Sequence, residues 1–74
     1  MKCLLPAKKM IVEARTKLDL YNAAEWVCDQ SRFRFDEQMT YAENAELARR
    51  QDKRGVAEFF ELAQVRFDAM ERCQ

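Results

Sequence analysis

The last third of the chain carries an apolar stripe with the repeat of an α-helix. Apolar residues recur there at three- and four-residue steps, at Val56, Phe59, Phe60, Ala63, Phe67 and Met70. This spacing places all of them on one face, and it predicts a helix over residues 55–72. Acidic and amide side chains occupy the other side of that helix. The stripe therefore has to be covered, either as a core face within the chain or as a dimer face.

A long helix is also predicted over residues 7–30. Pro6 suits the first turn of a helix, because that turn does not use the amide hydrogen that proline lacks. Apolar residues then continue at helical spacing up to Cys28. The resulting face is broad enough to contact two neighbouring helices.

A third helix is predicted between these two. Thr40 and Glu43 have the spacing of a capping box, so this helix begins either there or earlier, near Asp36. The earlier start is preferred, which gives a helix over residues 36–51. The polar run that follows ends at Gly55, the only glycine of the chain, and it predicts the turn into the last helix.

These segments predict an all-α fold, a small three-helix bundle built on an antiparallel helical hairpin. At 74 residues the chain has room for one helical domain, residues 1–74. A single core in a chain of fewer than about 70–80 residues supplies only a few kcal/mol. We therefore expect homodimerisation to complete the bundle, above all if the flank formed by Leu62, Val65 and Ala69 also has to be covered.

The composition argues against catalysis and metal binding. Histidine is absent, which removes the commonest zinc ligand and the usual general base near neutral pH. We therefore expect that the protein is not an enzyme, that it has no catalytic residues, and that it binds neither a cofactor nor a metal ion. Cys3, Cys28 and Cys73 lack C-x-x-C spacing and are expected to be free thiols, a disulfide between chain ends or across a dimer being the alternative.

The sequence favours a cytoplasmic protein that does not bind membranes. No apolar stretch approaches the roughly 20 residues of a membrane span, and the first residues do not resemble a secretory signal. The net charge is zero, with an excess of basic residues in the first half and of acidic residues in the second. Such a balance gives no general attraction to nucleic acid.

Basic residues gather at the predicted turn before the last helix. They are Arg49, Arg50, Lys53 and Arg54. A helix N-terminus presents free backbone amides, so this cluster is a candidate anion-binding site. The alternative is a solvated turn in which the basic side chains complement the carbonyl end of the preceding helix.

Residues 32–35 alternate arginine and phenylalanine, as a half-buried strand does. A short strand followed by two helices resembles the order of elements in ribbon-helix-helix repressors. The resemblance implies that Arg32 and Arg34 face DNA, while Phe33 and Phe35 face the core. A DNA-binding regulator is therefore one alternative function, and nucleic acid one alternative partner.

The preferred hypothesis is a small non-catalytic protein-binding module. Tryptophan, phenylalanine and arginine are the residues that protein interfaces favour, and the candidate interface consists of Trp26, Phe33, Phe35, Arg32 and Arg34. Such a chain would act as an adaptor or inhibitor that masks a surface of a larger protein by helix-face docking, as an accessory protein of a mobile element could. A purely structural, self-assembling subunit is the third possibility.

Overall fold

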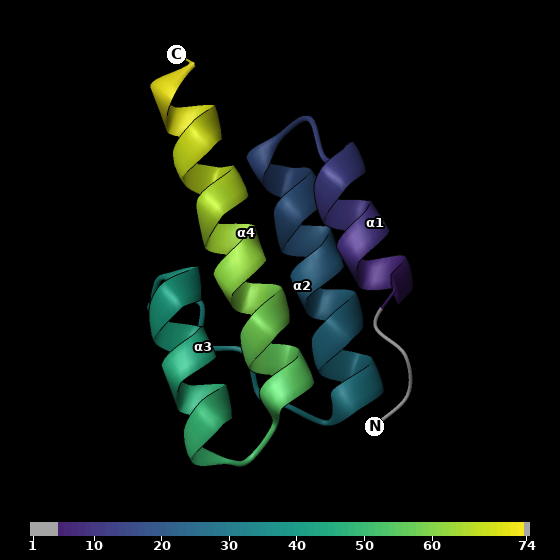
Figure 1. The fold of residues 1–74 in the computed structure, drawn as a ribbon, viewed down its shortest axis with the longest axis vertical. Coiled ribbons are helices and arrows are strands. Elements are labelled where there is room, and N and C mark those ends of the chain that lie inside the picture. Colours follow the sequence, from purple (N-terminus) through teal and green to yellow (C-terminus); the bar gives the residue numbers. More distant parts are fainter. Residues whose placement is uncertain (1–4, 74) are drawn as a thin grey trace.

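Helices account for all the regular structure in residues 5–73, the part of the chain that the computed structural model describes. These helices are α1 (Leu5–Glu13), α2 (Lys17–Ser31), α3 (Tyr41–Arg50) and α4 (Arg54–Arg72) (Figure 1). No strand occurs within this range. The all-α class predicted from the sequence is confirmed, with four helices in the described residues where three were predicted.

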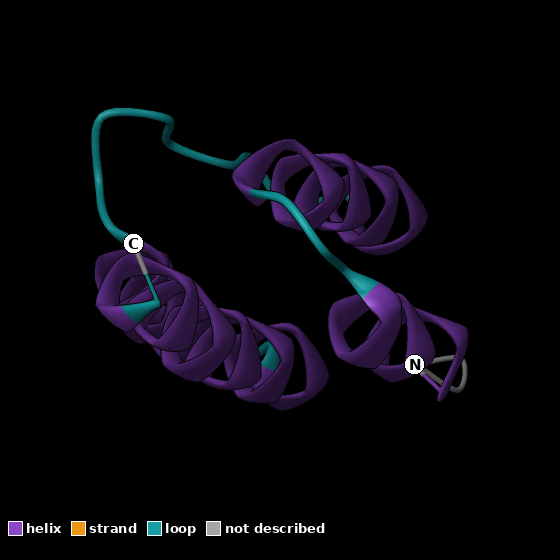
Figure 2. Ribbon diagram, turned by 90° about the horizontal axis from the view of Figure 1, so that it is seen from above, coloured by secondary structure: helices purple, strands orange, loops and turns teal. Residues whose placement is uncertain are grey.

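The longest helix, α4, is the central element. It packs against α1, α2 and α3, whereas α3 packs against no other helix in the described range. Figure 1 shows α3 on one side of α4 and the α1–α2 pair on the other, with α1 and α4 running in the same direction. The loop between α2 and α3 arcs along the edge of the molecule (Figure 2).

The core surrounds α4 and contains residues of all four described helices. Phe59 and Phe60 are fully buried there, together with Leu20 and Val27 of α2. The residues of the apolar stripe that are fully buried are Val56, Phe59, Phe60 and Ala63, and those that are partly buried are Phe67 and Met70. The chain's own helices therefore cover most of this stripe.

The prediction of a single helix over residues 7–30 is wrong, because residues 14–16 are not helical and separate α1 from α2. Thr16 is extended, with φ −129° and ψ 162°, and it forms a capping box with Asp19 at the start of α2. The Asp19 carboxylate accepts hydrogen bonds from the backbone N–H groups of Arg15 and Thr16, at 3.0 and 3.1 Å. These bonds hold the pKa of Asp19 below its usual value. The capping box thus satisfies donors that a helix start leaves free, and α1 can fold back beside α2.

The preferred start of the next helix, near Asp36, is also wrong. α3 begins at Tyr41, directly after the Thr40 cap. Thr40 Oγ1 accepts a hydrogen bond from Glu43 N at 3.0 Å, and the Glu43 carboxylate accepts one from Thr40 N at 2.9 Å. Residues 33–40 form an irregular loop instead of a first helical turn. The capping-box spacing was the correct signal for this boundary.

The turn between α3 and α4 lies where the sequence predicted it, but the glycine does not make it. Asp52 takes the left-handed conformation, with φ 60°, and Lys53 N donates to Ala48 O at 2.9 Å. Gly55 lies within the first turn of α4 and has no positive φ. Aspartate tolerates the left-handed region better than most residues, which explains how this turn forms without glycine.

We expect a Thr16→Ala variant to lose about 1 kcal/mol of unfolding free energy, because it removes the side-chain acceptor that caps α2. In a domain of this size such a loss lowers the melting temperature by about 4–8 °C. Circular dichroism melting of the purified variant measures the change. Thr16→Ser is the control, since its hydroxyl preserves the cap. Equal melting temperatures for Thr16→Ala and the parent protein would show that the cap does not stabilise the α1–α2 break.

Candidate functional site

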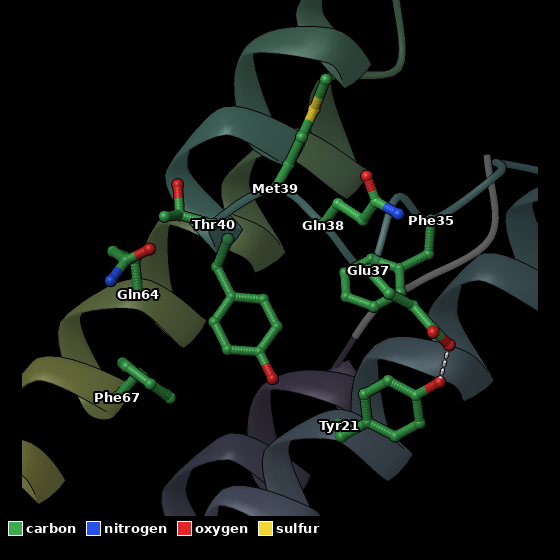
Figure 3. A pocket seen from close by; sticks show the side chains of 9 residues that line it. Tyr21, Phe35, Glu37, Gln38, Met39, Thr40, Gln64 and Phe67 are labelled. Atoms are coloured by element: carbon green, nitrogen blue, oxygen red, sulfur yellow. Dashed lines mark hydrogen bonds between the residues drawn. The ribbon is translucent and has the colours of Figure 1, made fainter.

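An open groove of about 340 Å³ lies between α2, the loop before α3, the first residue of α3 and α4. Its lining residues are Tyr21, Phe35, Glu37, Gln38, Met39, Thr40, Tyr41, Gln64 and Phe67. Figure 3 shows Phe67 and Gln64 of α4 on one side and Tyr21 with Glu37 on the other. We call this feature the aromatic groove.

The aromatic rings of the groove form a continuous chain of contacts. The Phe35 ring meets the edge of Tyr21 at a centroid distance of 5.8 Å and stacks on Tyr41 at 6.1 Å. Tyr41 in turn meets Phe67 edge-to-face at 5.8 Å. Phe60, which is fully buried, stacks against Phe35 and Tyr41 at 5.6 and 6.1 Å. Two rings that line the groove, Phe35 and Tyr41, therefore pack directly on the buried Phe60.

One carboxylate faces these rings. The Tyr21 hydroxyl donates a hydrogen bond to Glu37 Oε1 (Figure 3). This hydrogen bond, with the nearby Glu25 carboxylate as a smaller cause, raises the pKa of Tyr21 to about 12. Like any tyrosine, Tyr21 is neutral at physiological pH, so among the described lining residues only Glu37 carries a formal charge.

The residues predicted to form a protein interface do not form one exposed surface. Phe33 is only 3% exposed and packs on Phe60 at a centroid distance of 5.8 Å, so it is a core residue rather than an exposed anchor. Trp26 is partly buried against the core. Phe35 is also partly buried, and it lines the aromatic groove.

The segment predicted as a possible DNA-binding strand is a turn and a loop. Arg32 has φ 54° and ends α2 in the left-handed conformation, where its N–H donates to Cys28 O. Phe33 N donates to the same carbonyl at 3.1 Å. Arg32 and Arg34 are both exposed. The strand that the ribbon-helix-helix resemblance implies is therefore not formed by residues 32–35.

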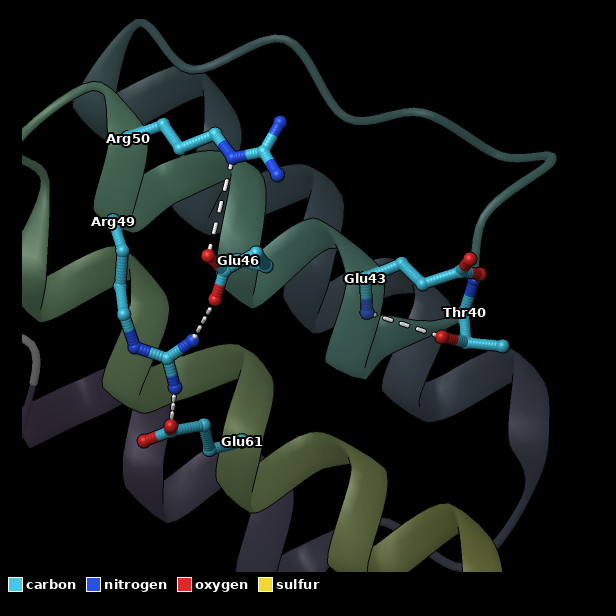
Figure 4. Close-up of polar contacts among 6 residues, drawn as sticks. All are labelled: Thr40, Glu43, Glu46, Arg49, Arg50 and Glu61. Atoms are coloured by element: carbon cyan, nitrogen blue, oxygen red, sulfur yellow. Dashed lines mark hydrogen bonds and ion pairs between the residues drawn. The ribbon is translucent and has the colours of Figure 1, made fainter.

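Carboxylates pair with the first two basic residues of the predicted anion site. Arg49 contacts Glu46 at 2.8 Å and also pairs with Glu61 of α4, while Arg50 Nε lies 3.9 Å from Glu46 (Figure 4). All four side chains are substantially exposed, and such pairs contribute only about 0–1 kcal/mol each. Their main effect is to reduce the positive charge at this end of α3.

The other two basic residues of that site point to different partners. Lys53 Nζ donates to the backbone carbonyl of Ser31 at 2.8 Å and so ties the α3–α4 turn to the end of α2. Arg54 Nε lies 3.9 Å from the Asp52 carboxylate, and both side chains are almost fully exposed. The four basic side chains therefore do not converge on one anion-binding position.

Two contacts join α1 to the parallel helix α4. Lys8 Nζ lies 2.5 Å from Glu58 Oε1, near the starts of both helices. Further along, Arg66 Nη2 donates to Ala14 O at 2.7 Å. The second bond satisfies a carbonyl group that the end of α1 leaves without a helical partner. The two helices thus share a seam between these contacts.

Large apolar side chains lie exposed along this seam. Val12 follows Lys8 by one turn of α1, and Leu62 follows Glu58 by one turn of α4, so both fall between the two contacts. Val12 is 75% exposed, Leu62 41%, and Val65, which follows Leu62 by three residues on the same face of α4, 65%. We call Val12, Leu62 and Val65 the α1–α4 strip. Monomeric soluble proteins expose single apolar side chains routinely, so this group matters here only because its three members lie close together along the axes of two neighbouring helices.

The described residues contain no cluster of three or more histidine, cysteine or acidic side chains able to hold a metal ion. Nor is any helix in that range sufficiently long and apolar to cross a bilayer.

Cys28 is a buried free thiol whose pKa is raised to about 11 mainly by burial, and Cys73 is an exposed free thiol. Cys3 lies outside the described residues.

Comparison of the chain with protein-family models, curated proteins and solved structures found no match. The two surfaces described above are therefore the basis for inferring a function. The sequence predicted Phe35 as an interface residue, and Leu62 and Val65 as part of a helix flank that a second copy could cover, but it gave no prediction for Val12 or Glu37. Val12 directly follows Ile11, so it points away from the apolar face of that helix, and a large apolar residue in such a position was a usable signal. Glu37 gave no signal, because its position depends on the path of the loop.

Proposed function

We propose that the protein is a non-catalytic binding module, an adaptor or inhibitor that uses the α1–α4 strip to mask a surface of a larger protein. The observation that carries this proposal is the exposure of Val12, Leu62 and Val65 along one seam between parallel helices. A seam of this kind suits an apolar helix of a partner, which can place side chains at i, i+3, i+4 and i+7 against it.

The surroundings of the strip have the arrangement of a small interface. Apolar side chains occupy its middle, and the ion pair of Lys8 with Glu58 lies at one end. Protein interfaces commonly combine an apolar centre with a polar rim. Full burial of one large aliphatic side chain contributes about 1.5–3 kcal/mol, although only part of that gain appears as affinity.

The other occupant to consider is a second copy of the chain. The apolar stripe of α4 was the main reason to expect a homodimer, and helices of the same chain cover most of that stripe. What remains exposed is a narrow seam. We therefore propose a different protein as the occupant, and light scattering on the purified protein tests the alternative of self-association.

We expect Val65→Glu to weaken binding of the partner at least about tenfold, which corresponds to 1.4 kcal/mol. The partner is first identified by photo-crosslinking from a reactive residue at position 65, and the affinity is then measured with the purified partner. Asn22→Glu is the matched control, because it adds the same charge at an exposed position of α2, outside the strip. Melting curves of both variants establish that they fold.

Two results would contradict this proposal. One is equal affinity of Val65→Glu and Asn22→Glu for the identified partner. The other is a dimer in the parent protein that Val65→Glu, but not Asn22→Glu, converts to a monomer. The second result would assign the strip to self-assembly.

A further inference from the structure

We infer that the aromatic groove binds an arginine side chain of a partner polypeptide, with the guanidinium stacked on the rings and paired with Glu37. The inference rests on the proposed role in protein binding, but it concerns a different face from the α1–α4 strip. Three features of the groove support it.

The first feature is the set of aromatic rings. Tyr21, Phe35, Tyr41 and Phe67 are all partly exposed, and their side chains line the same groove. A cation within about 6 Å of an aromatic centroid is attracted by the negative face of the ring. The planar guanidinium also stacks on such faces, as the compact, strongly hydrated ammonium of lysine does not.

The second feature is a cation that already contacts one of these rings. Lys17 Nζ lies 5.2 Å from the centroid of Phe67. The same ammonium lies 2.9 Å from Glu71, so a carboxylate and a ring together hold it. The groove also combines a carboxylate with aromatic rings, because Glu37 lines it together with Tyr21 and Phe35. Arg34 lies near Phe35 and Glu37, but within residues 5–73 no cation–π contact involves Tyr21 or Phe35 and no ion pair involves Glu37.

The third feature is the charge of the groove. Glu37 supplies its only formal charge among the described lining residues, and that charge is negative. The Tyr21 hydroxyl donates to Glu37 Oε1, and within residues 5–73 no hydrogen bond or ion pair engages Oε2. A guanidinium can donate to a carboxylate through two N–H groups. A neutral apolar side chain would instead shield the Glu37 carboxylate from water without supplying a positive charge, which is unfavourable.

The test is an NMR titration of the ¹⁵N-labelled protein with the peptide acetyl-Gly-Arg-Gly-amide. We expect saturable shifts at backbone amides of residues 35–41 and of Gln64. The same peptide with citrulline, which keeps the shape of arginine without its charge, should bind at least about fivefold more weakly. The lysine peptide should also bind more weakly, because its ammonium does not stack.

We expect Glu37→Gln to weaken the arginine peptide at least about fivefold, since the amide keeps an acceptor for Tyr21 but removes the charge. Glu13→Gln is the matched control, because it makes the same charge change at an exposed position on α1, outside the lining of the groove. It should leave the affinity within about twofold of the parent.

Several results would overturn the inference. They are equal affinities for the arginine and citrulline peptides, equal or tighter binding of the lysine peptide, equal effects of Glu37→Gln and Glu13→Gln, or shifts that map outside the groove. Absence of any saturable shift would overturn it as well. The Val65→Glu experiment tests the α1–α4 strip and not the aromatic groove. If Val65→Glu weakens partner binding but the groove binds no arginine peptide, the arginine inference is rejected and the proposed function stands.

Discussion

A Phe60→Ala variant is expected to be largely unfolded at room temperature. Phe60 is fully buried, and its ring contacts Phe33, Phe35, Tyr41 and Phe59 at centroid distances of 5.8, 5.6, 6.1 and 5.3 Å. Phenylalanine-to-alanine substitutions in cores cost about 3–5 kcal/mol. A core of this size supplies only about 3–5 kcal/mol in total, so the loss is comparable with the whole stability.

Urea unfolding followed by circular dichroism measures this effect. Leu62→Ala is the control on the same helix, because Leu62 is 41% exposed and lies outside the core, and we expect it to cost less than about 1 kcal/mol. A Phe60→Ala protein with a cooperative transition within 1 kcal/mol of the parent would contradict the central position that the structure gives to this ring.

The second large effect is expected for Asn44→Ala, which should cost about 2–4 kcal/mol. Asn44 is fully buried, and its side chain satisfies backbone groups of the loop before α3. Oδ1 accepts from Asp36 N at 2.9 Å, while Nδ2 donates to Asp36 O at 3.0 Å and to Thr40 O at 2.9 Å. Alanine leaves the N–H and C=O groups of Asp36 without this partner in a partly buried place, which is costlier than the loss of an exposed hydrogen bond, while Thr40 O keeps its bond from the backbone N–H of residue 44.

The readouts are thermal melting and amide hydrogen exchange of residues 36–40. We expect faster exchange at Asp36 N, because that amide loses its acceptor. Gln38→Ala is the control, as it alters an exposed side chain of the same loop. Unchanged melting and unchanged exchange at Asp36 in Asn44→Ala would show that the side chain does not hold the loop.

The sequence predicts α4 well and the N-terminal half poorly, for a physical reason. The stripe of α4 has a single period, and the predicted range of residues 55–72 differs from Arg54–Arg72 by one residue. In residues 7–30 the apolar pattern continues through a break in the backbone. Because α1 folds back onto α2 and α4, Ala7, Ile11 and Ala14 still face the core after the chain has changed direction. Thr16 and Asp19 carry the local signal for that break.

The candidate sites depend even more on tertiary structure. The alternation of residues 32–35 correctly indicates that Phe33 points inward, yet it does so from a loop and not from a strand. The side-chain types alone gave no reason to place Glu37 beside Tyr21, since 16 positions separate them. Asn44 is a polar residue next to the apolar positions Ala45 and Ala48, and only the returning loop shows which groups it satisfies.

The central position of α4 has a consequence for the order in which the protein can mature. Ribosomes deliver a chain from its N-terminus, so α1, α2 and α3 emerge before the helix against which each of them packs. Until Phe59 and Phe60 arrive, the apolar faces of α1 and α2 can cover only each other, and α3 has no helical partner. Acquisition of the native structure therefore awaits the translation of α4, and the nascent chain exposes apolar surface to chaperones up to that moment.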